Sequence, residues 1–420
     1  FKKMESYESG GNEYRGADGP LNVSPSRLEQ PLDRAFLEAA LQADYPYRED
    51  TNAAQQEGFG IADRTIHNGR RWSTANAYLH PARQRPNLTV MTGALSERVL
   101  FDGKRAIGVE YTVGGARHKV RAEREVILSG GTINSPQLLL LSGVGDRDHL
   151  SEHDIPLVAH VPGVGQNLQD HLDLRIQVKC KQPVSIYPAT KGFGRLAAGV
   201  RWLLTKKGVA ASNLFEVAGY IRSNPEVDYP NIQSNFMAIA ASYDGRKSYA
   251  GHGYQAHFDM MRPTSRGRVK LKSRDPRQPP SIVFNYLQTE SDRREVIDAF
   301  RLTREILSQE ALAPYDGGEL NPGPAVQSDE SILAWARAEG ETEYHPTSTC
   351  TMGNGDDAVV DGQLKVHGVE GLRVADASIM PRVVTANTNA ATIMIGEKAS
   401  DLIGGRTPLE PLYLAGKPNS

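Results

Sequence analysis

The spacing of hydrophobic residues changes from a helical to a strand period within the first 122 residues. In residues 31–43 (PLDRAFLEAALQA) apolar side chains recur every three or four positions, which predicts an amphipathic helix. From residue 98 alternate positions are apolar, in RVLF and then in RAIGVEY, with Asp102-Gly103 between them as a hairpin turn. A second turn at Gly114-Gly115 leads into ARHKVRA, a third strand. The pattern predicts a small antiparallel meander.

A buried strand and a helix are expected next, in EVILSGGTINSPQLLLLSGVG (125–145). Val126–Leu128 is the strand, and Ser135-Pro136 opens the helix, because proline is favoured in the first helical turn. The glycines between them would bring main-chain N–H groups close to a phosphate or cofactor, which makes Gly130 a candidate contact. Many such turns bind nothing.

The middle of the chain alternates like a sheet, and its end returns to strand and helix. Strands are expected in LRIQVKC, FEVAGYIRS, YQAHFDMM, GRVKLKS and SIVFNYL between 174 and 287, followed by a helix at 292–308. One covered face of an antiparallel sheet explains this pattern. Near the end, GLRVADASIMP predicts a short buried strand, and TANTNAATIMIGEKASDLIGG predicts a helix that ends at Gly404-Gly405. An α/β unit is therefore built from both ends of the chain.

Composition excludes several classes of protein. The 420 residues are 39% hydrophobic and 23% charged, with a net charge of −2 and a pI near 6.7, which is typical of a globular protein and gives no reason to expect a nucleic-acid partner. No apolar run approaches the roughly 20 residues of a membrane-spanning helix. Cys180 and Cys350 form no zinc or disulfide pattern, and no metal is expected among the eleven histidines.

Four motifs resemble the glucose-methanol-choline (GMC) family of FAD oxidoreductases. They are GTINSPQLLLLSGVG (131–145), VPGVGQNLQDH (161–171), HPTSTCTMG (345–353) and LRVADASIMPRVVTANTNAATIMIGEKASDLI (372–403). Within the family, YRGADGPLNVS (14–24), CKQPVSIYPA (180–189) and RPTSRGRVKLKSRDPRQPP (262–280) are most similar to the choline dehydrogenase branch. The family's GxGxxG phosphate loop has no match, so we expect the chain to start after it and FAD binding to depend on the missing segment.

The resemblance implies the roles of individual residues. His345 matches the active-site histidine, which would take the hydroxyl proton, and Asn387 matches the second polar group, which would hold the substrate oxygen. Asn387 and Asp376 could instead simply cap their helices. Cofactor contacts are expected at the following residues: Ser96, Gly130, Asp376, Ala377, Asn387, Thr388 and Asn389.

A quaternary ammonium substrate needs aromatic faces and a carboxylate. Glu216 is the candidate carboxylate and Tyr344 a candidate wall, although a glutamate on a strand more often faces solvent. His171 and His257 are expected to be structural, and the basic run 266–277 to be a solvated sheet face, with an anionic membrane or an electron acceptor as its alternative partner.

The resemblance therefore implies an FAD enzyme that oxidises choline to betaine aldehyde, a step toward glycine betaine, and passes electrons to a quinone-type acceptor. Peripheral association with the inner side of a bacterial cytoplasmic or mitochondrial inner membrane is expected. An oxidase, a dehydrogenase of another primary alcohol, a hydroxynitrile lyase and an inactive flavin-free fragment are the alternatives.

The expected fold is α/β (α+β), with a Rossmann-like FAD-binding domain that carries the antiparallel meander and an inserted antiparallel-sheet substrate domain. Residues 1–160 are expected to form the remainder of the FAD-binding domain, 161–335 the substrate domain, 336–408 the return to the FAD-binding domain, and 409–420 a tail.

Overall fold

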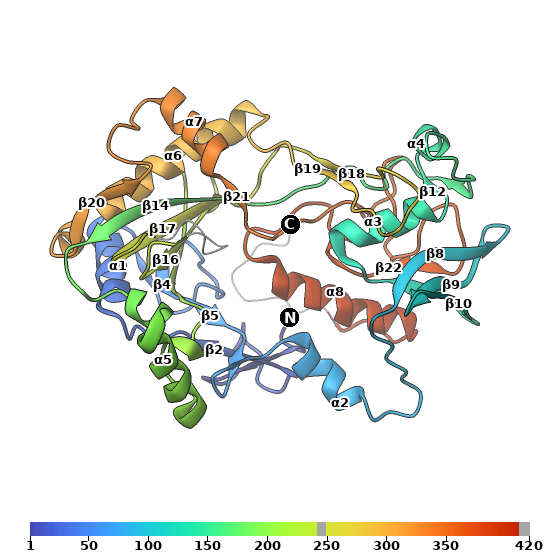
Figure 1. Cartoon of the computed structure of the whole chain (residues 1–420), viewed down its shortest axis with the longest axis horizontal. Helices are drawn as coiled ribbons and strands as arrows, with labels where there is room; N and C mark the ends of the chain where they lie inside the picture. The colour runs from blue at the N-terminus through green and yellow to red at the C-terminus, as the bar shows by residue number, and fades with distance from the viewer. Residues whose placement is uncertain (242–248, 411–420) are drawn as a thin grey trace. The chain divides into compact units, whose positions relative to one another are not determined.

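The computed structural model describes residues 1–241 and 249–410, so most of the expected tail lies outside the described residues (Figure 1). The chain divides into two compact units, and each is built from separate stretches of sequence. Unit 1 comprises residues 1–82, 172–261 and 289–343, and unit 2 comprises the rest. Among the described residues, no helix is both long and apolar enough to cross a membrane.

Unit 1 is organised around an eight-stranded, mostly antiparallel sheet with the order β20-β14-β17-β16-β15-β4-β3, in which β21 also pairs with β14. Its sheet strands are β3 (Tyr47–Arg48), β4 (Gly58–Ile61), β14 (Leu172–Cys180), β15 (Phe215–Ile221), β16 (Ile232–Met237), β17 (Gly253–Met260), β20 (Asp316–Asn321) and β21 (Glu341–Thr342). Its longer helices are α1 (Pro31–Gln42), α5 (Gly192–Thr205), α6 (Glu290–Leu307) and α7 (Asp329–Glu339). The smaller elements are β1 (Glu5–Tyr7), β2 (Leu21–Pro25), β5 (Asp63–Arg64), β6 (Ile66–His67), β7 (Arg70–Arg71) and α2 (His80–Ala82).

One face of this sheet is apolar and is covered by helices. Helix α1 packs on β4, β15 and β16, and α6 packs on β16 and β17 (Figure 1). The ring of Phe36 in α1 stacks on Phe236 of β16 at a centroid distance of 4.4 Å, and Phe300 of α6 lies 6.3 Å from Phe258 of β17. The apolar spacing of residues 31–43 predicted helix α1. The apolar side chains that recur along this helix form the face that packs on the sheet.

The other face of the sheet is polar, yet it is also buried. In β17 Tyr254, Ala256 and Phe258 alternate with Gln255 and His257, and all five side chains are buried. The alternation of apolar and polar residues along the strands predicted that only one face of the sheet is covered. The second face is covered as well, because its polar side chains form hydrogen bonds with one another rather than with water. The amide of Gln255, for example, lies 2.7 Å from His257 Nε2.

Unit 2 contains the α/β part of the fold. Its elements are β8 (Leu95–Asp102), β9 (Arg105–Val113), β10 (Ala116–Arg121), β11 (Val126–Leu128), α3 (Gly131–Leu141), β12 (Val144–Gly145), α4 (Arg147–Ser151), β13 (Ala159–His160), β18 (Arg268–Lys270), β19 (Ser281–Val283), β22 (Leu372–Val374) and α8 (Thr388–Ile403). Strands β8, β9 and β10 form the predicted meander, and β11 pairs in parallel with β22. The α/β unit made from both ends of the chain is thus confirmed.

The division into units differs from the expected domain boundaries. Residues 1–82 belong to unit 1 because β4 pairs with β15 along Gly58–Ile61 and so extends the inserted sheet. This pairing joins segments about 160 positions apart, which a local pattern of apolar residues does not encode. The sequence also failed to predict β16, α5 and α7.

The start of α3 corrects a second expectation. The helix begins at Gly131 rather than at Ser135-Pro136, so Pro136 lies inside it. Gly131 has φ +79°, a conformation that favours glycine, and it allows β11 to turn directly into the helix. Proline has no N–H, so the Thr132 carbonyl four residues earlier lacks its helical donor, and the Thr349 hydroxyl donates to that carbonyl instead at 2.6 Å.

We expect Thr349→Val to destabilise the protein by about 1–3 kcal/mol, because valine keeps the shape but leaves the buried Thr132 carbonyl unsatisfied. Thr349→Ser is the matched control, since serine keeps the hydroxyl. Urea unfolding of the three proteins provides the measurement, and equal stability of Thr349→Val and the wild type would contradict the role of this bond.

Candidate active site

His345 lies on a loop that several main-chain and side-chain bonds hold against α3 and the segment after β22. The Thr132 hydroxyl donates to the Pro346 carbonyl at 2.7 Å. The N–H groups of Cys350 and Met352 donate to the carbonyls of Ser378 and Ile379, at 2.8 and 2.9 Å. The residues that follow the histidine, Thr347 to Cys350, are all buried, so their hydroxyl and thiol groups serve the packing of this loop.

The segment Gln169–His171 holds the other side of the histidine. The Asp170 carboxylate accepts the His345 main-chain N–H at 2.9 Å and the Tyr286 hydroxyl at 2.5 Å. Gln169 pairs with Thr347 through two main-chain bonds, of 2.9 and 3.2 Å. His345 is only 8% exposed, so its imidazole is held in place by buried neighbours on both sides.

Two contacts involve the ring nitrogens of His345. The Asn387 amide nitrogen lies 3.2 Å from Nε2, and an amide N–H can only donate, so this contact is a hydrogen bond in the tautomer whose Nε2 is unprotonated. In that tautomer the proton of the ring is on Nδ1, which lies 3.0 Å from Nδ1 of His171, and the His171 nitrogen accepts it. The same tautomer has a basic lone pair on the side of Asn387.

His171, which the sequence context predicted to be structural, contacts His345, and whether it has a further role stays a prediction. It is fully buried, with its ring at right angles to that of His345 and the centroids 5.2 Å apart. The QDH triplet in VPGVGQNLQDH was the available signal, because it supplies both Asp170 and His171 as neighbours of His345. Tyr286 carried no such signal, since its contact to Asp170 spans 116 positions.

Asn387 occupies the N-cap position of α8, as the alternative interpretation held, but its side chain makes no cap bond. The amide is directed to His345 instead. With no side-chain cap, the first N–H groups of this 16-residue helix, at Thr388 and Asn389, keep the partial positive charge of a helix N-terminus. A helix end of this kind favours a negatively charged group nearby.

Asp376 is a capping residue with both carboxylate oxygens occupied. One oxygen accepts the Ser378 N–H at 2.8 Å, and the other accepts the Gly131 N–H at 3.0 Å and the Ser135 hydroxyl at 2.6 Å. The carboxylate thus ties the N-terminus of α3 to the segment after β22. Ala377 is half-buried in that segment, in the short helix Ala377–Ile379.

The remaining candidates in unit 2 lie on separate elements. Gly130 ends the β11 turn, and its N–H donates to the Ser135 hydroxyl at 3.0 Å. Ser96 is exposed on β8, where it pairs with Tyr111 of β9. Tyr344, next to His345, has φ +61° and a side chain that is 70% exposed. Cofactor or substrate contacts at these residues stay predictions.

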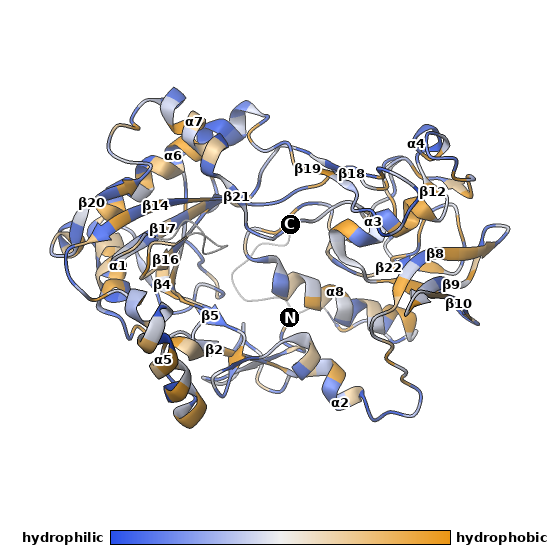
Figure 2. Ribbon diagram, in the orientation of Figure 1, coloured by the Kyte–Doolittle hydropathy of each residue, from blue (hydrophilic) through white to orange (hydrophobic). Residues whose placement is uncertain are grey.

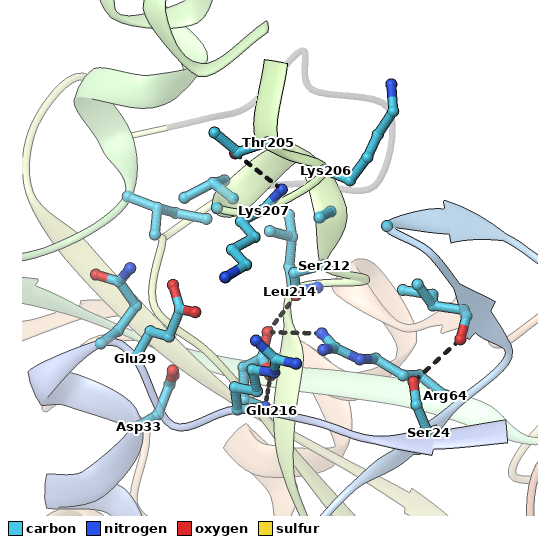
Figure 3. Close-up of a pocket in the computed structure, with 18 of the residues that line it drawn as sticks. Ser24, Glu29, Asp33, Arg64, Thr205, Lys206, Lys207, Ser212, Leu214 and Glu216 are labelled. Carbon is cyan, nitrogen blue, oxygen red and sulfur yellow. Dashed lines mark hydrogen bonds and ion pairs between the residues drawn. The ribbon is translucent and has the colours of Figure 1, made fainter. Parts of the chain in front are cut away.

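Glu216 belongs to unit 1 and lines a cavity of about 250 Å³ (Figure 3). A β-bulge in β15 falls at this residue. Its carboxylate accepts the Ser212 hydroxyl and, at 3.0 Å, the Arg27 N–H, and lies 3.7 Å from the Arg64 guanidinium. The charge of Glu216 is therefore already balanced within unit 1.

The lining of this cavity does not resemble a site for a quaternary ammonium group. No aromatic side chain among the described residues lines it, and Lys206 and Lys207 join Arg27 and Arg64 there. These four cations face four carboxylates: Glu8, Glu29, Asp33 and Glu216. Aromatic faces are what such a ligand needs. The assignment of Glu216 to the substrate stays a prediction, and the contacts of its side chain favour a structural role.

Asp33 of α1 is the unusual residue of this cavity. It is 1% exposed, and neither carboxylate oxygen has a hydrogen-bond partner among the described residues. Burial raises the pKa of Asp33 to about 7, and the nearby Glu216 carboxylate adds to the increase. The main chain of Gln30 offsets part of this increase in pKa, although its position relative to the Asp33 carboxylate does not meet the distance and angle of a hydrogen bond.

We expect Asp33→Asn to stabilise the protein at pH 8 and to have little effect near pH 4. The unfolded carboxyl ionises near its ordinary pKa of 3.8 whereas the folded one stays protonated up to about 7, so its contribution to stability is lost as the pH rises through that window. The difference amounts to at most about 4 kcal/mol at pH 8. Thermal unfolding at several pH values measures it.

Asp18→Asn is the control for this experiment, because Asp18 is exposed. A difference between Asp33→Asn and the wild type that did not change between pH 4 and pH 8 would refute the raised pKa.

Family models and known proteins place the chain in one family. Models of the N-terminal and C-terminal parts of GMC oxidoreductases match residues 1–173 and 263–396. The chain is 53% identical to an oxygen-dependent choline dehydrogenase of Pseudomonas putida over 413 residues, which cover 97% of this chain and 73% of that protein. It is 54% identical to the protein of the same name from Pseudomonas aeruginosa, over 97% of this chain and 74% of that one.

Solved structures agree with the sequence relatives. Pyridoxine 4-oxidase from Mesorbium loti matches with a TM-score of 0.86 at 28% identity, over 97% of this chain and 76% of its own. A formate oxidase from Aspergillus oryzae matches with a TM-score of 0.89 at 25% identity, over 96% and 77%. With its two family matches, its relatives above 50% identity and this shared fold, the chain belongs to the GMC oxidoreductase family.

Proposed function

We propose that this protein oxidises choline to betaine aldehyde with FAD as its cofactor, and that His345 is the base. The observation that carries the proposal is the buried imidazole whose Nε2 lies 3.2 Å from the Asn387 amide nitrogen. The name of the relatives that are more than 50% identical over nearly the whole chain supplies the substrate.

FAD, when bound, supplies the acceptor for the hydride that leaves the alcohol carbon. The N–H groups at the start of α8 would hold its pyrimidine edge, since that helix end favours negative charge. Gly130 and Ala377 are further candidate contacts, because each lies at an end of the parallel β11–β22 pair. Ser96 and Asp376 complete the proposed set of cofactor residues.

The residues of this chain perform the proton chemistry. The substrate hydroxyl loses its proton to Nε2 of His345, while its oxygen replaces that nitrogen as the partner of the Asn387 amide. An amide donates a hydrogen bond to an alkoxide but cannot remove a proton, so one base and one donor share the work. The imidazole gains a proton while its Nδ1–H stays directed at His171, so the ring need not rotate.

The electron acceptor is a separate question. A quinone-type acceptor and peripheral contact with a membrane are inferences from the family resemblance, whereas the printed name of the relatives specifies oxygen. Oxygen consumption during turnover, with and without a soluble quinone, distinguishes these two acceptors.

The proposal is tested by an anaerobic visible spectrum of the purified flavoprotein before and after addition of choline. We expect the flavin absorbance to bleach, because choline supplies the hydride. An aliphatic primary alcohol without the ammonium group is the matched control. Bleaching by the control alone would reassign the substrate, and a flavin that stays oxidised with both would reject alcohol oxidation.

We expect His345→Ala to lower kcat by about 10²–10⁴-fold, the usual contribution of a general base. Asn387→Ala should lower it by about 10²–10³-fold through loss of one donor to the alkoxide. Single-turnover flavin reduction measures both. Near-normal reduction by His345→Ala would remove the histidine from the mechanism.

His171 is a positioning residue, and its test requires a conservative variant. His171→Leu removes the acceptor for the Nδ1–H of His345, whereas the side-chain oxygen of His171→Asn can still accept it. We expect the leucine variant to lose kcat and to shift the acidic limb of its pH profile, and the asparagine variant to recover much of both. Equal profiles for the two variants would mean that His171 only fills space.

A further inference from the structure

The cavity of unit 1 in Figure 3 is lined by polar groups of both kinds that lack a hydrogen bond. Both carboxylate oxygens of Asp33, which are acceptors, are buried with no partner among the described residues. The Nε of Arg64, which is a donor, is buried and has no partner there either. Buried polar groups are normally hydrogen-bonded, because an unsatisfied one costs free energy. These two side chains therefore mark the cavity as a place that a polar ligand can complete.

The acidic side of the cavity lacks a cation at Asp33. This residue is 1% exposed, and the nearby Glu216 carboxylate contributes to its raised pKa. Glu216 already has partners, which include the Ser212 hydroxyl and the Arg64 guanidinium. The charge without compensation is thus that of an ionised Asp33. A ligand group with positive charge and several N–H donors would satisfy both of its oxygens.

Lys206 and Lys207 follow helix α5, which Figure 2 colours as largely apolar, and both line the cavity. Lys207 is exposed. In Figure 3 its side chain is directed toward the side of the cavity that carries Glu29 and Asp33. A negatively charged group of a ligand can therefore pair with Lys207 while it accepts from Arg64 Nε. The cavity thus offers a place for a positive and for a negative group.

We propose that this cavity binds a small zwitterion, a molecule that carries a primary ammonium and an acidic group. The ammonium would donate to Asp33, and the acidic group would accept from Arg64 Nε and pair with Lys207. A volume of about 250 Å³ suits a molecule of the size of an amino acid. A quaternary ammonium does not fit, because it has no N–H to donate and no aromatic side chain among the described residues lines the cavity. The proposal goes beyond alcohol oxidation and does not depend on it.

The test is isothermal titration calorimetry of the flavoprotein at pH 8 with a series of ω-amino acids: glycine, β-alanine, γ-aminobutyrate and 5-aminovalerate. They differ in the distance between ammonium and carboxylate, and we expect at least one of them to bind. The trimethylated counterpart of that ligand is the matched control, because methylation keeps both charges and removes every N–H. We expect it to bind at least about tenfold more weakly, since the charge-assisted hydrogen bonds are lost.

Single variants locate the binding. Asp33→Asn should weaken it by at least about tenfold, because the amide has no charge for the ammonium. Lys207→Ala should weaken it by about two- to fivefold, since an ion pair at an exposed side chain contributes little. Asp18→Asn and Lys104→Ala are the matched controls, because both residues are exposed and lie outside the cavity, and they should bind as the wild type does. Circular dichroism checks that each variant is folded.

A wild type that binds none of these ω-amino acids, or an Asp33→Asn variant that binds as tightly as the wild type, would overturn the proposal. Equal binding of the trimethylated ligand would overturn it as well. That result would assign the cavity to a quaternary ammonium group, as the sequence predicted for Glu216. Turnover plays no part in these measurements, so they are independent of the test of alcohol oxidation.

Discussion

The buried carboxylate of Asp376 is the contact on which the candidate active site depends. It accepts three hydrogen bonds, two from the first residues of α3 and one from the segment after β22. A carboxylate taken out of water is costly unless donors of this kind surround it. The same two segments then hold the His345 loop through Thr132, Ser378 and Ile379. Removing the charge of Asp376 would weaken the connection between α3 and the segment after β22. It would also weaken the support of the His345 loop, which both segments hold.

The two buried faces of the sheet in unit 1 are stabilised by different interactions. Its helix-covered face is stabilised by aromatic packing, whereas its other buried face is made of amides, acids and a histidine that must find partners among themselves. His257 illustrates this, with Asp173 at 2.9 Å and Gln255 at 2.7 Å. Such networks are stable only when nearly every group is satisfied, so they fix side-chain positions closely. Asp33 of α1 has no such partner for either carboxylate oxygen among the described residues, and burial raises its pKa to about 7.

Elements that depend on local spacing could be predicted from the sequence. The helix of residues 31–43, the meander, the β11 strand and α8 all have one apolar face or one clear turn, and each was found. Helix α5 was missed because glycines interrupt its start and because its large apolar residues, such as Phe193 and Leu204, are exposed and mark no buried face. Strand β16 was missed because polar residues interrupt its apolar pattern and are buried with it.

The residues of the candidate site likewise differ in whether a local sequence motif or only a long-range contact identifies them. His345 and Asn387 were identified through the family motifs, and the structure adds their direct contact through Nε2 and the amide, which a motif does not specify. His171 and Tyr286 act through contacts across more than a hundred positions, and no local pattern specifies those. Glu216 was chosen for its charge and its aromatic neighbour in sequence. Neither feature predicts that its carboxylate pairs with the Arg64 guanidinium and accepts a hydrogen bond from the Ser212 hydroxyl.

The parallel pairing of β11 with β22 joins residues that are 246 positions apart, because Val126 lies opposite Leu372. During synthesis the first strand therefore leaves the ribosome long before its partner exists, and the buried Val126 and Leu128 side chains wait without their native neighbour. The intervening segments of unit 1 can fold in that interval, since their sheet contains its own strands. Unit 2 is thus completed last, when residues 344–420 have been synthesised, and until then Val126 and Leu128 lack the strand that pairs with theirs.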